Sequence, residues 1–271
     1  AGSDAIEMNV SCPHGMPEQG VGAAIGQNPE MVRDLTRAVK SAVEIPVIVK
    51  LTPNVTDILP IARAAAAGGA DMISAINTVQ CLSGIDLNSF EPLPSVAGYS
   101  TYGGYSGPAI KPIGLRVVSQ VASAVDLPVI GIGGISGWRD AAEYLLAGAS
   151  AVQVCTAVMW NGFGIVREMQ SGLSSYLARK GVSTPDRLRG LALGRLHSHQ
   201  SLDRAFRVRP TLSTPELCTS CGRCVIACRD GGYHAIALND GKPEFDHARC
   251  DGCSLCSHVC PEGALILSRE G

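Results

Sequence analysis

Eight of the eleven cysteines in this 271-residue sequence lie between positions 218 and 260. They form two runs of the pattern C-x2-C-x2-C-x3-C. Thiolates this close together on one segment can wrap a single inorganic centre, so the runs predict metal ligation. The first run is Cys218, Cys221, Cys224 and Cys228, and the second is Cys250, Cys253, Cys256 and Cys260.

The spacing within the runs indicates two 4Fe-4S clusters, in which three thiolates of one run and the fourth of the other hold each cube. Zinc also takes four thiolates, but zinc sites usually separate their cysteine pairs. Disulfides are not expected, because the sequence shows no secretory signal. The predicted sets are Cys218, Cys221, Cys224 and Cys260, and then Cys228, Cys250, Cys253 and Cys256.

Other residues that could take part in catalysis or phosphate binding lie at or just after strand-like runs. They are Lys50 in VKLTPN, Gly107 in YSGPAIKP, the stretch GIGG at 131–134, and CTA at 155–157. In a (β/α)8 barrel, catalytic and phosphate-binding groups occupy these positions. A dinucleotide-binding reading of GIGGISG fails, because Ser136 stands where the third glycine is needed.

Strand-like and helix-like segments alternate through the first two thirds of the chain, which predicts βαβ units and an α/β fold. Five apolar runs read as parallel strands, at AIEMN, PVIVKL, DMISAIN, PVIGI and AVQVC. A (β/α)8 barrel needs three more. We therefore expect the C-terminal five strands of a TIM barrel, with the first three upstream of residue 1. Helices are expected at 29–43, 57–67, 114–125, 137–146 and 164–179.

The expected domains are a partial (β/α)8 barrel at 1–180, a helical linker at 181–207 and an α+β two-cluster ferredoxin domain at 208–271. The formal net charge of −2 and the lack of any basic run give no indication that the protein binds nucleic acid or an anionic membrane. No apolar run approaches the roughly 20 residues of a membrane span. A cytoplasmic protein is expected.

Several motifs together resemble the dihydropyrimidine dehydrogenase family, and within it the FMN and iron-sulfur subunit of the bacterial NAD-dependent enzymes. They are NVSCPHG, KLTPNVTD, AINTV, TYGGYSGPAIKP, GIGGI and QVCTA, followed by the two cysteine runs. The resemblance implies reversible conversion of 5,6-dihydropyrimidines to pyrimidines, with a hydride exchanged between C6 and the flavin and a proton exchanged at C5.

The resemblance also implies roles for individual residues. Cys12 matches the acid/base, and an ordinary thiol pKa near 8.5 suits that role; a buried unreactive cysteine is the alternative. Lys50 would stabilise negative charge on reduced flavin. The matches to substrate contacts are Asn9, Ser11, His14, Asn77 and Thr78. The matches to flavin contacts through main-chain groups are Gly107, Ile132, Gly133, Gly134, Cys155 and Thr156.

No NAD-binding fingerprint is present in the sequence, so an NAD(H)-binding FAD flavoprotein subunit is the expected partner, within an oligomer. One rival reading is a dihydroorotate dehydrogenase-like enzyme with a fused ferredoxin, because its barrel shares much of NVSCP, KLTPN and SGPAIKP. Another is an electron-transfer ferredoxin carried on an inert barrel remnant.

Overall fold

The computed structural model describes residues 2–10, 22–202 and 208–269, and the chain divides into two compact units. The first unit is Ala1–Leu196 and the second is His197–Gly271. Part of the expected linker, residues 181–196, therefore belongs to the first unit. The backbone N–H groups of Gly190 and Ala192 donate to carbonyls at the end of helix α5 (Trp138–Leu146), at 2.9 and 3.1 Å.

A five-stranded parallel sheet forms the centre of the first unit, in the order β1-β2-β3-β8-β9. Every expected strand is present, which confirms the α/β prediction. Strands β1 and β9 are the two edges of this sheet. The bounds are β1 Ile6–Asn9, β2 Val47–Leu51, β3 Met72–Ala75, β8 Val129–Ile132 and β9 Ala151–Gln153.

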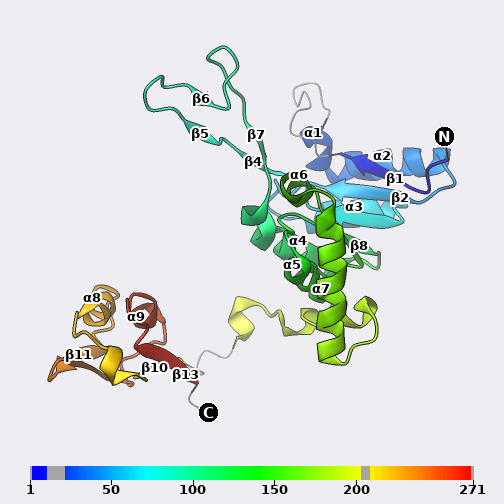
Figure 1. Ribbon diagram of the computed structural model, residues 1–271. Coiled ribbons are helices and arrows are strands. Elements are labelled where there is room, and N and C mark those ends of the chain that lie inside the picture. The colour runs from blue at the N-terminus through cyan, green and yellow to red at the C-terminus, as the bar shows by residue number, and fades with distance from the viewer. Residues whose placement is uncertain (1, 11–21, 203–207, 270–271) are drawn as a thin grey trace. The chain divides into compact units, whose positions relative to one another are not determined.

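Helices connect consecutive strands of the sheet and cover it (Figure 1). The start of α2 shows why they form where the sequence predicts them. Asn28 Oδ1 accepts hydrogen bonds from the N–H groups of Glu30 and Met31, and Pro29 occupies the first helical position. The helices are α2 Pro29–Ala42, α3 Leu59–Ala67, α4 Lys111–Ala124 and α5 Trp138–Leu146.

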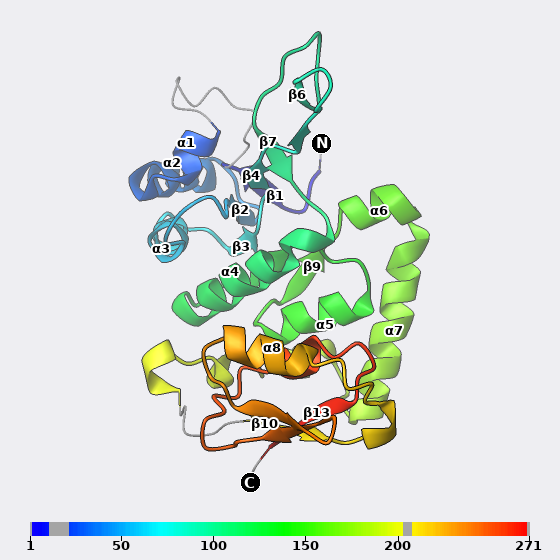
Figure 2. The ribbon, with the colours of Figure 1, turned by 90° about the vertical axis from the view of Figure 1, so that its left-hand side faces the viewer.

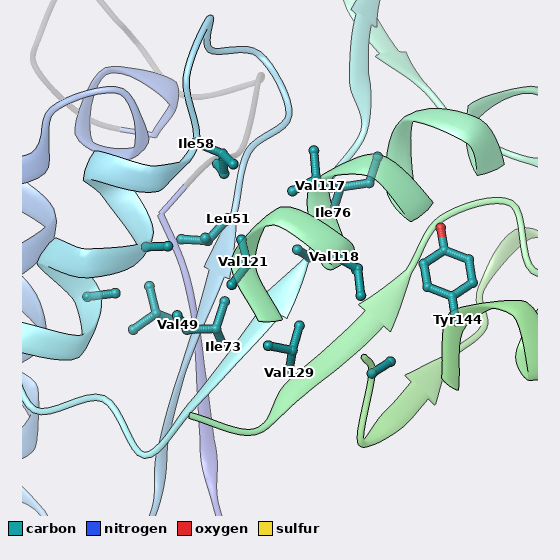
Figure 3. Close-up of a cluster of buried hydrophobic side chains, with 14 of the residues drawn as sticks. Val49, Leu51, Ile58, Ile73, Ile76, Val117, Val118, Val121, Val129 and Tyr144 are labelled. Carbon is teal, nitrogen blue, oxygen red and sulfur yellow. The ribbon is translucent and has the colours of Figure 1, made fainter. Parts of the chain in front are cut away.

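The core lies between the sheet and its helices, with α4 packed across β3 and β8 (Figure 3). Its side chains are almost all aliphatic, as expected when a parallel sheet is covered by helices. Tyr144 of α5 is the largest side chain that is fully buried among the described residues. The other members labelled in Figure 3 are Val49, Leu51, Ile58, Ile73, Ile76, Val117, Val118, Val121 and Val129.

A long two-stranded excursion between β3 and α4 leaves the body of the unit, as both ribbon views show (Figures 1 and 2). We call residues 79–105 the arm. In it β4 (Val79–Cys81) pairs with β7 (Gly103–Tyr105), and β5 (Gly84–Ile85) pairs with β6 (Pro92–Leu93), both antiparallel. These four strands are not among the five that the sequence predicts.

Helices α6 (Thr156–Asn161) and α7 (Gly164–Lys180) follow β9 in the first unit, and a short helix, α1 (Ala23–Gly26), precedes α2. Gly181 ends α7 in the left-handed conformation, with φ of 66°. No helix in the described ranges is long and apolar enough to cross a membrane.

Among its described residues, the second unit contains two antiparallel strand pairs and two short α-helices. Strand β10 (Val208–Leu212) pairs with β13 (Leu265–Arg269), and β11 (Ile236–Asn239) pairs with β12 (Lys242–Phe245). The helices are α8 (Arg223–Asp230), which overlaps the end of the first cysteine run, and α9 (Leu255–His258), which lies within the second. A small core of its own, which includes Ile236 and Leu265, holds this unit together.

Candidate functional site

A cavity of about 280 Å³ opens at the carboxyl ends of β2, β3, β8 and β9. In sheets of this kind, ligands bind at these strand ends, because the connecting loops there differ in sequence while the sheet stays constant. Nine residues singled out from the sequence line it. They are Lys50, Asn77, Thr78, Gly107, Ile132, Gly133, Gly134, Cys155 and Thr156.

One wall of the cavity includes the amide of Asn77, in the loop after β3, which contacts the amide of Asn9 at the end of β1 behind the lining residues. Asn77 Nδ2 donates a hydrogen bond to Asn9 Oδ1 at 2.9 Å, and Asn77 Oδ1 accepts from the N–H of Thr78 at 2.8 Å. Asn54, which the sequence analysis did not select, supports the same segment. Its Nδ2 donates to the Thr78 carbonyl at 3.1 Å, and its Oδ1 accepts from the N–H of Gln80 at 2.9 Å.

Lys50 is held by an acid inside the sheet. Its Nζ lies 3.2 Å from Glu7 Oε1, and the two side chains are only 21% and 26% exposed. Gln153 Nε2 donates to the other Glu7 oxygen at 2.8 Å. The Glu7 carboxylate therefore links Lys50 on β2 to Gln153 on β9, and both of these residues line the cavity.

Glu7 remains ionised despite its burial. Burial alone raises its pKa, but the hydrogen bond from Gln153, attraction from Ser74 and the charge of Lys50 outweigh that effect and lower the pKa. The Ser74 hydroxyl is close enough to contribute, although it makes no hydrogen bond of normal geometry among the described residues. Sequence reasoning missed Glu7 and Gln153; the one available signal was an acid within an otherwise apolar strand.

The glycine-rich loop after β8 is held from behind by a buried hydroxyl. Tyr144 Oη donates to the Gly133 carbonyl at 2.7 Å and lies 3.2 Å from the Ile132 carbonyl. Gly133 and Gly134 have φ values of 118° and 70°, which other residues rarely adopt. A Cβ on Gly134 would also lie 2.7 Å from the backbone nitrogen of Lys111. The loop thus presents its main chain to the cavity.

Charged groups fix the end of the same loop that leads into α5. Asp140 Oδ2 accepts from the N–H of Ser136 at 2.8 Å, and Asp140 Oδ1 lies 2.7 Å from Lys111 Nζ. Hydrogen bonds to Asp140 and then to Glu143 raise the pKa of Lys111. The loop is consequently tied to the starts of both α4 and α5.

The opposite side of the cavity joins two further loops. Thr156 Oγ1 donates to Ser106 Oγ at 3.0 Å, so the start of α6 contacts the segment before α4. Cys155, directly before α6, is exposed, whereas Cys81 on the arm is partly buried. Ser11, Cys12 and His14 fall outside the described residues.

The eight cysteines of the second unit separate into two groups of four around two small cavities. Within the described ranges, no three His, Cys, Asp or Glu side chains converge as a single metal ion would require. One cavity is lined by Cys218, Cys221, Cys224 and Cys260, and the other by Cys228, Cys250, Cys253 and Cys256.

Burial protects some of these thiols from ionisation. It raises the pKa of Cys256 to about 11 and also raises the pKa of Cys224. Near the protein surface, by contrast, the backbone N–H of Arg223 lowers the pKa of Cys221. Cysteines bind iron as thiolates, so a bound centre must displace protons from the buried pair.

Comparison with known protein families accounts for both units. Residues 2–177 match the family model described as dihydroorotate dehydrogenase. The chain belongs to the dihydroorotate dehydrogenase family. Residues 214–267 match the model of the 4Fe-4S dicluster domain. The dihydroorotate dehydrogenase family has a TIM-barrel fold, so the comparison also confirms the predicted combination of part of such a barrel with a ferredoxin-type module.

Two individual relatives that align with this chain are subunits of different enzymes. The NAD-dependent dihydropyrimidine dehydrogenase subunit PreA of Escherichia coli is 44% identical over 272 residues, covering 98% of this chain and 66% of the relative. The catalytic subunit of dihydroorotate dehydrogenase B (NAD⁺) of Pyrococcus abyssi is 51% identical over 191 residues, covering 70% of this chain and 61% of the relative. This chain therefore spans slightly less than two thirds of either relative.

A solved structure supports the fold of the first unit. The crystal structure of DHODH from Eimeria tenella, in complex with ferulenol, aligns with a TM-score of 0.58 at 25% identity. The alignment covers 70% of this chain and 54% of that chain. The motif resemblance inferred from the sequence is confirmed by the Escherichia coli relative, which aligns along both units.

Proposed function

We propose that this chain interconverts 5,6-dihydropyrimidines and pyrimidines, such as dihydrouracil and uracil or dihydrothymine and thymine, on FMN. Electrons would pass through two 4Fe-4S clusters to or from an NAD-linked flavoprotein. The observation that carries the proposal is the union, in one chain, of a cavity at the strand ends and a dicluster module. The dihydropyrimidine dehydrogenase subunit of Escherichia coli aligns with 98% of the present chain, and the alignment includes both the cavity and the dicluster module.

The walls of the cavity fit FMN. The glycine loop offers main chain without side chains, and at Gly134 a Cβ would collide with α4. Loops in the same positions of barrels bind phosphate through backbone N–H groups. When bound, FMN supplies hydride exchange at its N5 position. The groups proposed to hold it are those of Gly107, Ile132, Gly133, Gly134, Cys155 and Thr156.

Lys50 would place a positive charge against the flavin, where it stabilises the negative charge of the reduced ring. Glu7 and Gln153 support this role, because the Glu7 carboxylate holds the Lys50 ammonium in the cavity wall. The ionised carboxylate also offsets part of the desolvation cost of a charged lysine in this partly buried position.

The substrate ring would lie against the amide wall. A pyrimidine alternates carbonyl and N–H groups, and an amide side chain can both donate and accept. The contact between Asn9 and Asn77 supports their joint role, because it orients each amide, and Thr78 lines the same cavity. By resemblance, Ser11 and His14 are further substrate contacts.

Cys12 is proposed as the acid/base. Reduction of the C5=C6 double bond needs a hydride at C6 and a proton at C5, and the Cys12 thiol would donate that proton. In the reverse direction the thiolate accepts it. General acid catalysis of this kind contributes about 10²- to 10⁴-fold.

The two groups of cysteines are proposed as cluster ligands, three from one run and one from the other in each case. Their separation into two cavities supports these sets. The two electrons of the hydride would leave singly through the clusters. We propose an NAD(H)-binding FAD subunit as the partner within a cytoplasmic oligomer, and the name of the Escherichia coli relative as a subunit of an NAD-dependent enzyme supports that partner.

A second candidate function is dihydroorotate oxidation with a fused ferredoxin. The observation in its favour is the 51% identity to the dihydroorotate dehydrogenase B of Pyrococcus abyssi over 191 residues. That relative aligns with 70% of this chain, whereas the dihydropyrimidine dehydrogenase subunit aligns with 98%. Turnover with uracil and with orotate distinguishes the two functions.

Half-reactions of the Cys12→Ala variant test the proposal. Because the described sheet has five strands and a (β/α)8 barrel has eight, we specify an extended chain, in which three strands from a relative complete the barrel. With the NAD-linked partner, NADH should reduce the clusters of the variant as fast as those of wild type. Uracil should then reoxidise the variant at least 10²-fold more slowly. Equal slowing of both steps would overturn the role of Cys12.

A further inference from the structure

The internal sequence repeat of the second unit includes residues other than the cysteines. A basic residue also precedes each run at a similar distance. Arg209, on β10, stands nine residues before Cys218, and Lys242, at the start of β12, stands eight residues before Cys250. The two basic residues are thus related by the internal repeat to within one position.

The contacts of these two side chains cross between the halves. Arg209 Nη1 donates a hydrogen bond to the backbone carbonyl of Cys250. Lys242 Nζ donates to the backbone carbonyl of Cys218 at 3.1 Å and to that of Pro215 at 2.6 Å. Each cation therefore binds the first cysteine of the opposite run, on its main-chain oxygen.

Both side chains are partly buried, where charges interact more strongly than in open water. Lys242 forms no ion pair with a carboxylate of the described residues. Its charge is therefore not neutralised by an acid there and acts on the ligand loop that it contacts.

We infer that Arg209 and Lys242 are positioning residues that set the reduction potentials of the two clusters, each acting on one of them. The inference rests on the proposed binding of two 4Fe-4S clusters. Reduction adds one negative charge to a cluster, so a positive charge fixed beside a ligand favours the reduced form. Lys242 acts on the cluster held by Cys218, and Arg209 acts on the cluster held by Cys250.

Charge removal with the donor retained tests this inference. In Lys242→Gln and Arg209→Gln the amide can still donate to the carbonyl, but the charge is gone. Anaerobic redox titration of the full chain with reconstituted clusters, followed by electron paramagnetic resonance, measures each potential. Each variant should lower the equilibrium constant for one-electron reduction of one cluster about tenfold, which corresponds to about 59 mV. Lys242→Arg and Arg209→Lys should restore the wild-type values.

Arg249→Gln is the matched control. Arg249 is adjacent to Cys250 in sequence, but its side chain is 64% exposed and lies 3.7 Å from Asp246, so its charge is screened by solvent and by its partner. The control changes the net charge equally and should shift neither potential appreciably.

The possible outcomes separate the two proposals. If the control shifts the potentials as much as Lys242→Gln does, only the net charge matters. If one variant shifts both clusters equally, the crossed assignment is wrong. Either result overturns the inference. Wild-type protein that takes up far fewer than about eight irons would overturn the proposed clusters as well. Full iron content with unshifted potentials would overturn this inference alone.

Discussion

Asn77 Nδ2 donates a hydrogen bond to Asn9 Oδ1 at 2.9 Å, which joins the loop after β3 to the end of β1, 68 positions away. The two strands are not neighbours in the sheet, because β2 lies between them. The contact therefore fixes the amide orientations across three strands, at the edge where the cavity opens.

Asn77→Asp should weaken substrate binding because an oxygen replaces the nitrogen that donates to Asn9. Loss of one hydrogen bond and a new oxygen-oxygen contact cost about 1–3 kcal/mol, so KM for uracil in the extended chain should rise about 5- to 150-fold. Steady-state kinetics measures the effect, with the exposed arm residue Asn88→Asp as the control. An unchanged KM would remove Asn77 from the substrate wall.

Glu7→Gln should destabilise the first unit in a pH-dependent way. The folded-state pKa of Glu7 is lowered, so its ionised form contributes stability above the unfolded-state pKa near 4.3, and this contribution is lost as pH falls through the folded-state value. Wild type should exceed the variant by about 1 kcal/mol at pH 7.

Urea unfolding at several pH values measures that difference. The wild-type advantage should shrink as the solution is made more acidic, whereas the exposed Glu44→Gln control should show little difference from wild type at any pH. A constant advantage across the acid range would show that the carboxylate charge of Glu7 is not what stabilises the fold.

Tyr144 should tolerate loss of its hydroxyl far better than loss of its ring. Tyr144→Phe removes the hydrogen bond to the Gly133 carbonyl and should cost about 1 kcal/mol in the free energy of unfolding. Tyr144→Ala empties a fully buried site and should cost about 3–5 kcal/mol. Thermal or urea unfolding compares them, with exposed Tyr99→Phe as the control. Equal costs for the two substitutions would contradict this packing.

The 271-residue chain by itself should bind FMN weakly. Its sheet ends at β1 and β9, whereas a barrel closes by pairing its edge strands, so part of the cavity wall has no counterpart among the described strands. Titration of flavin fluorescence measures the affinity, and the extended chain should bind much more tightly. Stoichiometric, tight binding by the shorter chain would contradict the expectation of a partial barrel.

Local patterns explain which features the sequence predicted. The cysteine runs are short-range spacings, and the five strands are apolar segments that must be buried on both faces, so neither needs long-range information. Helix α2 began where expected because Asn28 and Pro29 are adjacent start signals. The glycines at 133 and 134 were selected because their loop follows a predicted strand.

Long-range contacts explain what the sequence did not predict. Glu7 and Gln153 meet across 146 positions, and nothing near either residue indicates the other. The arm contains very short strands with many exposed apolar residues, including Phe90, so it lacks the alternation that marks a half-buried strand. Asn54 acts through the backbone of Thr78, a contact that exists only in the folded chain.

The most direct test of the proposed function is reoxidation of reduced clusters by two competing substrates. The extended chain, with its partner, is reduced anaerobically by NADH and then mixed with uracil or with orotate, while visible absorbance follows the clusters. We predict that uracil reoxidises them rapidly and that orotate does not. Rapid reoxidation by orotate, with none by uracil, would contradict this prediction and identify dihydroorotate chemistry instead.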